Sequence, residues 1–168
     1  MDLNNDGYKK NNYGQPQNAQ KEEPLSEDKV EEFKSYLETL DKKIEERYGR
    51  VRLNERLNVE RIKKTLSVMG KCIAEGYIKI TENKSKKYIH VNKVRYNNES
   101  SGEDALSSLK IAISDKLKAP WLKRVNLFDI PFQVATRGSE KQCIEMKHTF
   151  SNFKYTAEVR LIIREKIL

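Results

Sequence analysis

The spacing of apolar residues changes along this chain, and that change limits the folds open to it. Between residues 30 and 73, apolar side chains recur at intervals of three and four, which is the period of an amphipathic helix. From residue 77 onwards several segments alternate apolar and polar residues, which is the period of a half-buried strand. We therefore expect an α+β fold with two N-terminal helices, then a mostly antiparallel sheet of about five strands with one packed helix.

Residues 1–24 differ in composition from the rest of the chain. They are rich in Asn, Gln, Gly and Lys and hold almost no aliphatic side chains. Such a segment cannot bury enough apolar surface to offset the entropy that is lost on ordering. We predict a disordered tail over residues 1–24, followed by a single basic α+β domain over residues 25–168.

The first predicted helix lies within residues 25–49 and carries its apolar side chains on one narrow stripe. Ser26 is a suitable N-cap, acidic residues occupy the first turns, and Gly49 is placed to end the helix. The stripe has two interpretations: it packs against its own domain, or residues 26–48 dock into a protein partner. The candidate partner-binding residues are Val30, Phe33, Leu37, Leu40 and Ile44.

The second predicted helix follows Asn58, which we assign as its N-cap, and ends before Gly76, which we assign to the position just past its C-terminus. Its expected buried stripe is Val59, Ile62, Leu66, Met69 and Ile73.

The third predicted helix begins at Ser101 or Gly102, with Asp104 at a capping-box position, and Pro120 closes it. Its expected buried stripe is Leu106, Leu109, Ile113 and Leu117.

Two hairpins are predicted from the alternating segments. The first joins strands at residues 77–80 and 88–96 through a polar turn at 82–87. The second joins its strands through the tight turn 151–154. The strands predicted in the C-terminal part are residues 125–136, 143–150 and 155–164.

Charge is divided unevenly between the two parts of the chain. Residues 1–48 hold 8 Lys/Arg and 12 Asp/Glu, which leaves 25 of the 33 basic residues and 13 of the 25 acidic residues in the remainder. A folded surface with such an excess attracts polyanions. We expect a nucleic-acid partner, with duplex DNA favoured and RNA as the second candidate.

The first hairpin carries the strongest candidate for this contact. Its lysines can neutralise phosphates, and the tyrosines between them offer stacking surfaces. The alternative interpretation is a solubilising turn. The candidate nucleic-acid-binding residues of the hairpin are Lys79, Lys84, Lys86, Lys87, Lys93 and Arg95.

Residues 62 to 91 join a helix, the segment Glu75-Gly76-Tyr77-Ile78 and a basic hairpin, and this stretch resembles the recognition helix and wing of winged-helix DNA-binding proteins. The resemblance implies that the helix enters the major groove and that the wing touches the backbone. The implied helix contacts are Lys63, Lys64 and Lys71, and the implied wing contacts are the turn lysines named above.

Residues 87 to 168 run in the order strand, helix, strand and strand hairpin, which resembles the Alba group of small nucleic-acid-binding proteins. In that group a basic strand hairpin and a loop grip the duplex backbone. The resemblance implies backbone contacts at Lys147, Lys154, Arg160 and Arg164.

No residue pattern indicates an enzyme. The sequence has no P-loop, no Gly-x-Gly-x-x-Gly and no paired Cys-x-x-Cys. Cys72 and Cys143 stand 71 residues apart, and His148 belongs to the apolar face of its strand while Glu145 lies on the other face. We expect no catalytic residue, no metal and no cofactor.

These observations predict a non-enzymatic nucleic-acid-binding protein, as an accessory subunit of a nucleic-acid-acting complex. The alternative is a structural subunit that binds protein through residues 26–48, with no direct nucleic-acid contact. The isolated thiols predict a reducing intracellular compartment, with the nucleus or nucleoid favoured and the cytoplasm as the alternative. The apolar runs are far shorter than the about 20 residues that span a bilayer, so we expect no membrane partner.

Overall fold

The computed structural model describes residues 24–49, 51–53, 59–117, 130, 132–137 and 143–166. The predicted tail up to residue 23, the Asn58 cap and the Pro120 stop lie outside the described residues. The described helices are α1 (Glu27–Tyr48), α2 (Val59–Val68) and α3 (Gly102–Asp115).

The predicted ends of α1 and the predicted start of α3 are confirmed. The Ser26 hydroxyl accepts a hydrogen bond from the backbone N–H of Lys29, and the Ser101 hydroxyl accepts one from Asp104. Gly49 ends α1 with φ of 87°, a left-handed value that glycine adopts without strain, and its N–H donates to the carbonyl of Glu45.

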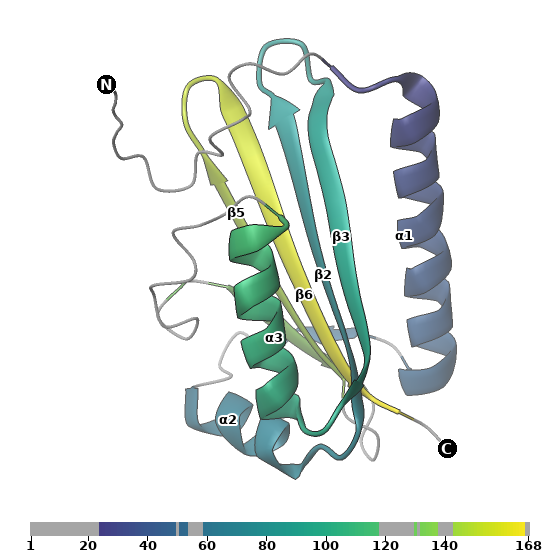
Figure 1. Cartoon of the computed structure of the whole chain (residues 1–168), viewed down its shortest axis with the longest axis vertical. Helices are drawn as coiled ribbons and strands as arrows, with labels where there is room; N and C mark the ends of the chain where they lie inside the picture. The colour runs from purple at the N-terminus through teal and green to yellow at the C-terminus, as the bar shows by residue number, and fades with distance from the viewer. Residues whose placement is uncertain are drawn as a thin grey trace.

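Antiparallel pairing organises the strands into one sheet (Figure 1). Within the described residues the sheet has six strands in the order β1-β4-β5-β6-β2-β3. The α+β class and the antiparallel pairing are therefore confirmed, while the expected count of about five was not exact. The long strands are β2 (Cys72–Glu82), β3 (Tyr88–Glu99), β5 (Cys143–Ser151) and β6 (Tyr155–Glu165), and the short ones are β1 (Val51–Leu53) and β4 (Gln133–Arg137).

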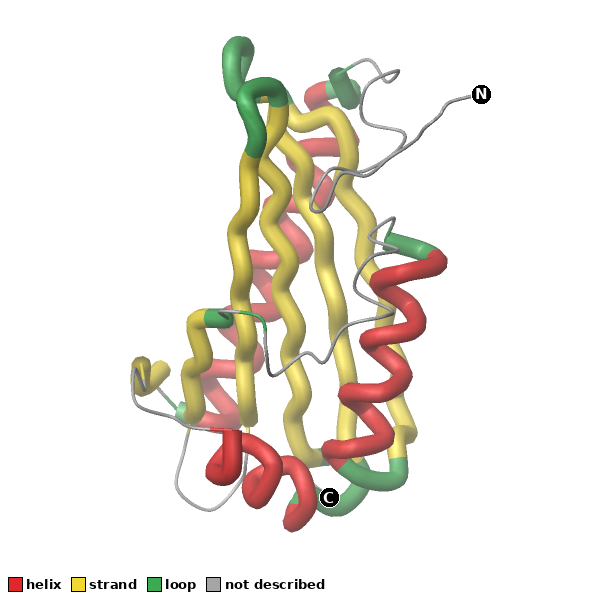
Figure 2. Tube along the Cα trace, turned by 90° about the vertical axis from the view of Figure 1, so that its left-hand side faces the viewer, coloured by secondary structure: helices red, strands yellow, loops and turns green. Residues whose placement is uncertain are grey.

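Helices cover both faces of this sheet (Figure 1, Figure 2). On the face under α3 the larger core collects alternate strand residues, among them Ile78 and Ile163. Their neighbours Tyr77 and Ile162 point the other way and pack under α1. Strand alternation thus yields two cores, and the α1 face is the more polar of the two.

The second helix ends earlier than predicted. It stops at Val68, and β2 begins at Cys72, so Ile73 and Gly76 are strand residues and Gly76 caps no helix. The spacing from Met69 to Ile73 fits a helix, but β2 pairs with β6 along its whole length, beginning at Cys72 opposite Glu165. Pairing with strands on both sides outweighs the local pattern.

The apolar stripe of α1 faces its own sheet, which is the first of the two interpretations above. Phe33, Leu40 and Ile44 are buried, and Val30 and Leu37 are half-buried. While α1 is docked in this way, the three buried residues are not available to a protein partner.

The remaining predicted elements agree with the structure where it describes them. The hairpin of β5 and β6 turns at residues 151–154, with Ser151 opposite Thr156. Of the strand predicted over residues 125–136, the structure describes Ile130 and residues 132–136. The observed strand β4 begins at Gln133 and lies beside the edge strand β1. Of the predicted stripe of the third helix, Leu109 and Ile113 are buried within α3, and Leu117 is buried just after its end.

Contact between α2 and α3 depends on a close backbone approach at Gly102. A Cβ atom there would lie 2.6 Å from the Leu66 carbonyl oxygen and 2.9 Å from its Cα. We expect Gly102→Ala to lower the free energy of unfolding by about 1–3 kcal/mol, although alanine favours helix, because α2 must shift. Gly70→Ala is the control, since the nearest atom to its Cβ is Glu165 Oε2 at 4.0 Å. Urea unfolding that found equal stabilities for the two variants would contradict this packing.

Candidate nucleic-acid interface

The two hairpin turns lie together at one end of the molecule and are joined by hydrogen bonds of Asn83 (Figure 2). The Asn83 backbone N–H donates to the Lys154 carbonyl at 2.8 Å. Its side-chain amide donates to the Asn152 carbonyl at 2.8 Å and accepts from the Thr156 hydroxyl at 2.6 Å. Because Asn83 belongs to the first turn and bonds to groups of the second turn and of β6, the relative position of the two turns is fixed.

Each turn also has internal hydrogen bonds. In the turn between β5 and β6, the Asn152 carboxamide oxygen accepts from the N–H groups of Lys154 and Tyr155, both at 2.8 Å. In the turn between β2 and β3, the Ser85 hydroxyl donates to the Glu82 carboxylate at 2.6 Å. These bonds hold the backbone of both turns without using any lysine side chain.

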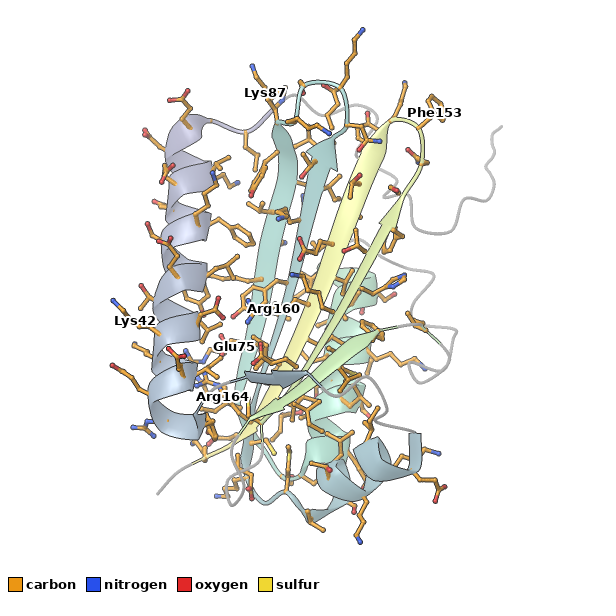
Figure 3. The ribbon with its side chains drawn as sticks, turned by 180° about the vertical axis from the view of Figure 1, so that it is seen from behind. Lys42, Glu75, Lys87, Phe153, Arg160 and Arg164 are labelled. Atoms are coloured by element: carbon orange, nitrogen blue, oxygen red, sulfur yellow. The ribbon has the colours of Figure 1, made fainter. Side chains whose placement is uncertain are left out.

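The exposed side chains of this end form what we call the tip surface (Figure 3). Phe153 is 88% exposed, which is high for an apolar aromatic side chain. The four lysines around it are all exposed. The tip surface consists of Lys84, Lys86, Lys87, Phe153 and Lys154.

This arrangement suits a polyanion that also offers flat apolar surface. Ammonium groups bind phosphate oxygens as point charges, and an exposed aromatic ring can stack on a base. In the described part of the chain, none of the four tip lysines forms an ion pair with a carboxylate. Their charge is therefore directed to solvent.

The helix α2, which carries Lys63 and Lys64, lies at the other end of the sheet from the turn between β2 and β3 (Figure 1). Lys71 precedes the first residue of β2, while Lys84 follows the last, and a strand of 11 residues is about 36 Å long. Lys63 and Lys64 belong to α2, beside Lys71, and all three are exposed. The structure therefore does not bring these lysines and the turn lysines onto one surface.

The three remaining hairpin cations lie on the body of the sheet. Lys79 pairs with Glu158 at 2.9 Å. Burial lowers the pKa of Lys79, but the hydrogen bond and the charge of Glu158 raise it, and the pKa lies above its ordinary value. Lys93 Nζ lies 3.2 Å from the ring centroid of Tyr36. Arg95 is exposed, and its Nε donates to Asn97 Oδ1 at 2.6 Å.

Two arginines implied by the Alba resemblance face α1 rather than the outer surface (Figure 3). Arg160 pairs with Asp41 of α1 at 2.5 Å and with Glu145 at 2.8 Å. Burial lowers the pKa of the Arg160 guanidinium, but its two carboxylate partners raise it further. Arg164 is buried and pairs with Glu75 at 2.5 Å. Neither guanidinium is placed to grip a duplex.

The other two implied contacts differ from each other. Lys147 pairs with Glu158 at 2.9 Å, and its side chain is 51% exposed. Burial raises the pKa of Glu158, yet its bonds to Lys147 and Lys79 hold that pKa below the ordinary value. Lys154 belongs to the tip surface.

Glu75 is the centre of a buried polar cluster beneath α1. It is fully buried, and its carboxylate accepts from the hydroxyls of Tyr36 and Tyr77 at 2.9 Å and from Arg164 at 2.5 Å. These donors come from α1, β2 and β6 respectively. Burial and then the Glu75 charge raise the pKa of Tyr77 and of Tyr36.

His148 and the two cysteines lie in apolar or buried surroundings. His148 packs between Phe132 and Phe150, with ring centroids 5.7 and 5.6 Å away. Cys72 and Cys143 are buried and free, and burial raises the pKa of Cys72 to about 11. Among the described residues, no three His, Cys, Asp or Glu side chains are grouped as metal ligands would be.

In comparisons with known proteins, no family model, curated protein or solved structure matches this chain. Over the described ranges, no helix is both long and apolar enough to cross a bilayer.

The sequence reasoning missed Asn83 and Phe153 as parts of this site. The two turns were predicted separately, and each was assigned correctly. Their meeting depends on the pairing of β2 with β6, which places Glu82 opposite Tyr155. An aromatic residue inside a four-residue turn between two strands was the available signal for Phe153.

The hydrogen bond from Tyr77 to buried Glu75 gives a pH-dependent prediction. At about pH 7, Tyr77→Phe should lower the free energy of unfolding by about 1.5–3 kcal/mol, because a buried carboxylate loses a donor. The raised pKa means that Tyr77 stabilises the fold below its ordinary value of 10.0 and that this contribution is lost as the pH rises above it. The deficit of the variant should therefore shrink above about pH 10.

Urea unfolding of both proteins between about pH 7 and 11 measures this difference. Tyr96→Phe is the control, since Tyr96 is half-buried on the α3 face and makes no contact with Glu75. A deficit that stays constant across this range would refute the assigned role of the phenol.

Proposed function

We propose that this protein is a non-enzymatic nucleic-acid-binding protein that uses the tip surface, with duplex DNA favoured and RNA as the second candidate. The main support for the proposal is that hydrogen bonds of Asn83 hold the two turns together. Four lysines and Phe153 therefore lie exposed at one end of the molecule. The lysines neutralise phosphates, so most of the affinity comes from counterion release and is independent of sequence. Phe153 adds a stacking surface for a base that is open or easily opened.

Fixed turns support this proposal energetically. Both turns are ordered by their own hydrogen bonds, so binding need not order the backbone, and only the lysine side chains lose freedom. This function belongs in the nucleus or nucleoid, as an accessory subunit of a complex that acts on nucleic acid. The alternative protein-binding subunit has less support, because the α1 stripe faces its own sheet.

The first test removes the turn charges. The triple variant Lys84→Gln, Lys86→Gln and Lys87→Gln should stay folded, because all three residues are exposed. Its binding to duplex DNA should weaken for all sequences alike. The slope of log affinity against log salt should become shallower by about 0.9 for each lost contact, or about 2–3 in total. Fluorescence polarisation at several salt concentrations measures both quantities.

The matched control is Lys63→Gln, Lys64→Gln and Lys71→Gln, which removes the same charge from the opposite end. Its slope should equal that of the wild-type protein. If the salt slope becomes shallower in the control and not in the turn variant, the contact surface is at α2. No binding by the wild-type protein at low salt would reject nucleic-acid binding by this chain.

Phe153 provides a second test with a different readout. We expect Phe153→Ala to weaken binding to single-stranded DNA or RNA by about 1–3 kcal/mol, the range for loss of one base stack, with little change in the salt slope. Stability should not fall, because the ring is 88% exposed. Ile111→Ala, which truncates an exposed apolar side chain on α3, is the control. Equal binding by both variants would exclude a stacking role for Phe153.

A further inference from the structure

A cleft lies between the second half of α1 and the sheet, at the end of α1 that is remote from the tip surface (Figure 3). Its volume is about 510 Å³, which is within the range of small-molecule sites. Its apolar walls include Leu40 and Ile73, and Tyr36 and Tyr48 also line it. The cations that line it are Lys43, Arg47, Arg95, Arg164 and Lys166.

The lining of this cleft is strongly basic. The lining includes five cationic side chains but only one carboxylate, that of Glu46. Arg95 and Lys166 donate to the neutral side chains of Asn97 and Asn98, at 2.6 Å in each case. Over the described ranges, only Arg164 of the five forms an ion pair with a carboxylate. A small anion in the cleft would meet several charges that the protein itself leaves unneutralised.

Arg164 is the buried cation of this lining. Its side chain is 8% exposed, and its Nη2 donates to Glu75. Its Nε is fully buried and has no hydrogen-bond partner among the described residues. A buried N–H without an acceptor is destabilising, and a guanidinium presents its N–H groups as a planar fork suited to an oxyanion. Because Nε has no exposed surface, an acceptor in the cleft would reach it only after a shift of the side chain.

We propose that this cleft binds a phosphorylated small molecule, with its phosphomonoester among Arg47, Arg95 and Arg164 and its organic part against Leu40, Ile73 and Tyr36. A phosphomonoester carries a charge of about −1.5 to −2 at pH 7 and three acceptor oxygens, so it matches several cations at once. A carboxylate carries only one charge and two oxygens, so it would leave more of the cations in the cleft unneutralised. The same chemistry occurs in a free mononucleotide and in the 5′-phosphate at the end of a strand.

This site is separate from the tip surface. The helix α1 has 22 residues and is therefore about 33 Å long, and it begins near the tip surface, where the Leu25 N–H bonds the Tyr88 carbonyl. The residues of α1 that line the cleft run from Tyr36 to Tyr48. The proposal therefore does not rest on nucleic-acid binding at the tip, and either can fail alone.

Calorimetric titration with adenosine 5′-monophosphate tests the proposal. The wild-type protein should bind this probe and should not bind adenosine at the same concentrations. Lys43→Gln with Arg47→Gln should weaken binding by about tenfold or more, since two charged contacts are lost. Lys29→Gln with Lys42→Gln removes the same charge from exposed positions of α1 that do not line the cleft, and it should change binding by less than about twofold.

A second titration distinguishes the two sources of the phosphate. A short oligonucleotide with a 5′-phosphate is compared with the same oligonucleotide ending in a hydroxyl. If the phosphorylated strand binds more tightly than the hydroxyl-ended strand, and the Lys43/Arg47 variant alone removes that difference, the ligand is a strand end. If adenosine 5′-monophosphate binds in the same variant-dependent way, the cleft takes the free mononucleotide.

Nuclear magnetic resonance of arginine Nε–H groups follows Arg164 in the wild-type protein, so this readout needs no variant that risks unfolding. The Arg164 signal should shift on addition of the probe that binds. The proposal is overturned if neither phosphorylated probe binds at millimolar concentration, if adenosine binds equally well, or if the Lys29/Lys42 control loses as much affinity as the cleft variant.

Discussion

The fold is organised around a carboxylate that is buried with its charge neutralised. Glu75 lies near the start of β2 with no exposed surface, and its partners come from α1, from β2 itself and from β6. A buried carboxylate without these donors would be strongly destabilising. The cluster therefore fixes where α1 docks, because Tyr36 must reach Glu75, and it favours the register that places Arg164 beside this carboxylate.

This cluster also explains where the positive charge of the chain is displayed. The net charge is +8, yet α1 holds eight acidic and five basic residues and covers the face that carries Arg160 and Arg164. Asp41 and Glu75 neutralise those two arginines directly. Charge that is not neutralised in this way remains at the hairpin turns and around the cleft, so the overall count alone does not locate a binding surface.

Local patterns predicted what local interactions determine. The caps at Ser26 and Ser101, the stop at Gly49 and both hairpin turns follow from residues within a few positions of each other. The start of β2 and the sites of Arg160 and Arg164 depend on pairing between residues more than 80 positions apart, and no local period encodes that. The spacing of the α1 stripe likewise indicated a buried face without indicating what covers it.

The position of α1 determines whether the two ends of the molecule act together. Coupling between distant sites requires an element that has two arrangements, and each ligand must shift the equilibrium between them. Here α1 has one docked arrangement, held by Tyr36 at Glu75 and by Asp41 at Arg160. Substitutions far apart that share no partner contribute additively to free energies. The free-energy effects of charge changes at the tip surface and in the cleft should therefore add. Tyr36 lines the cleft and also anchors α1, so the effect of a change at Tyr36 should not add to the effects of changes in the cleft.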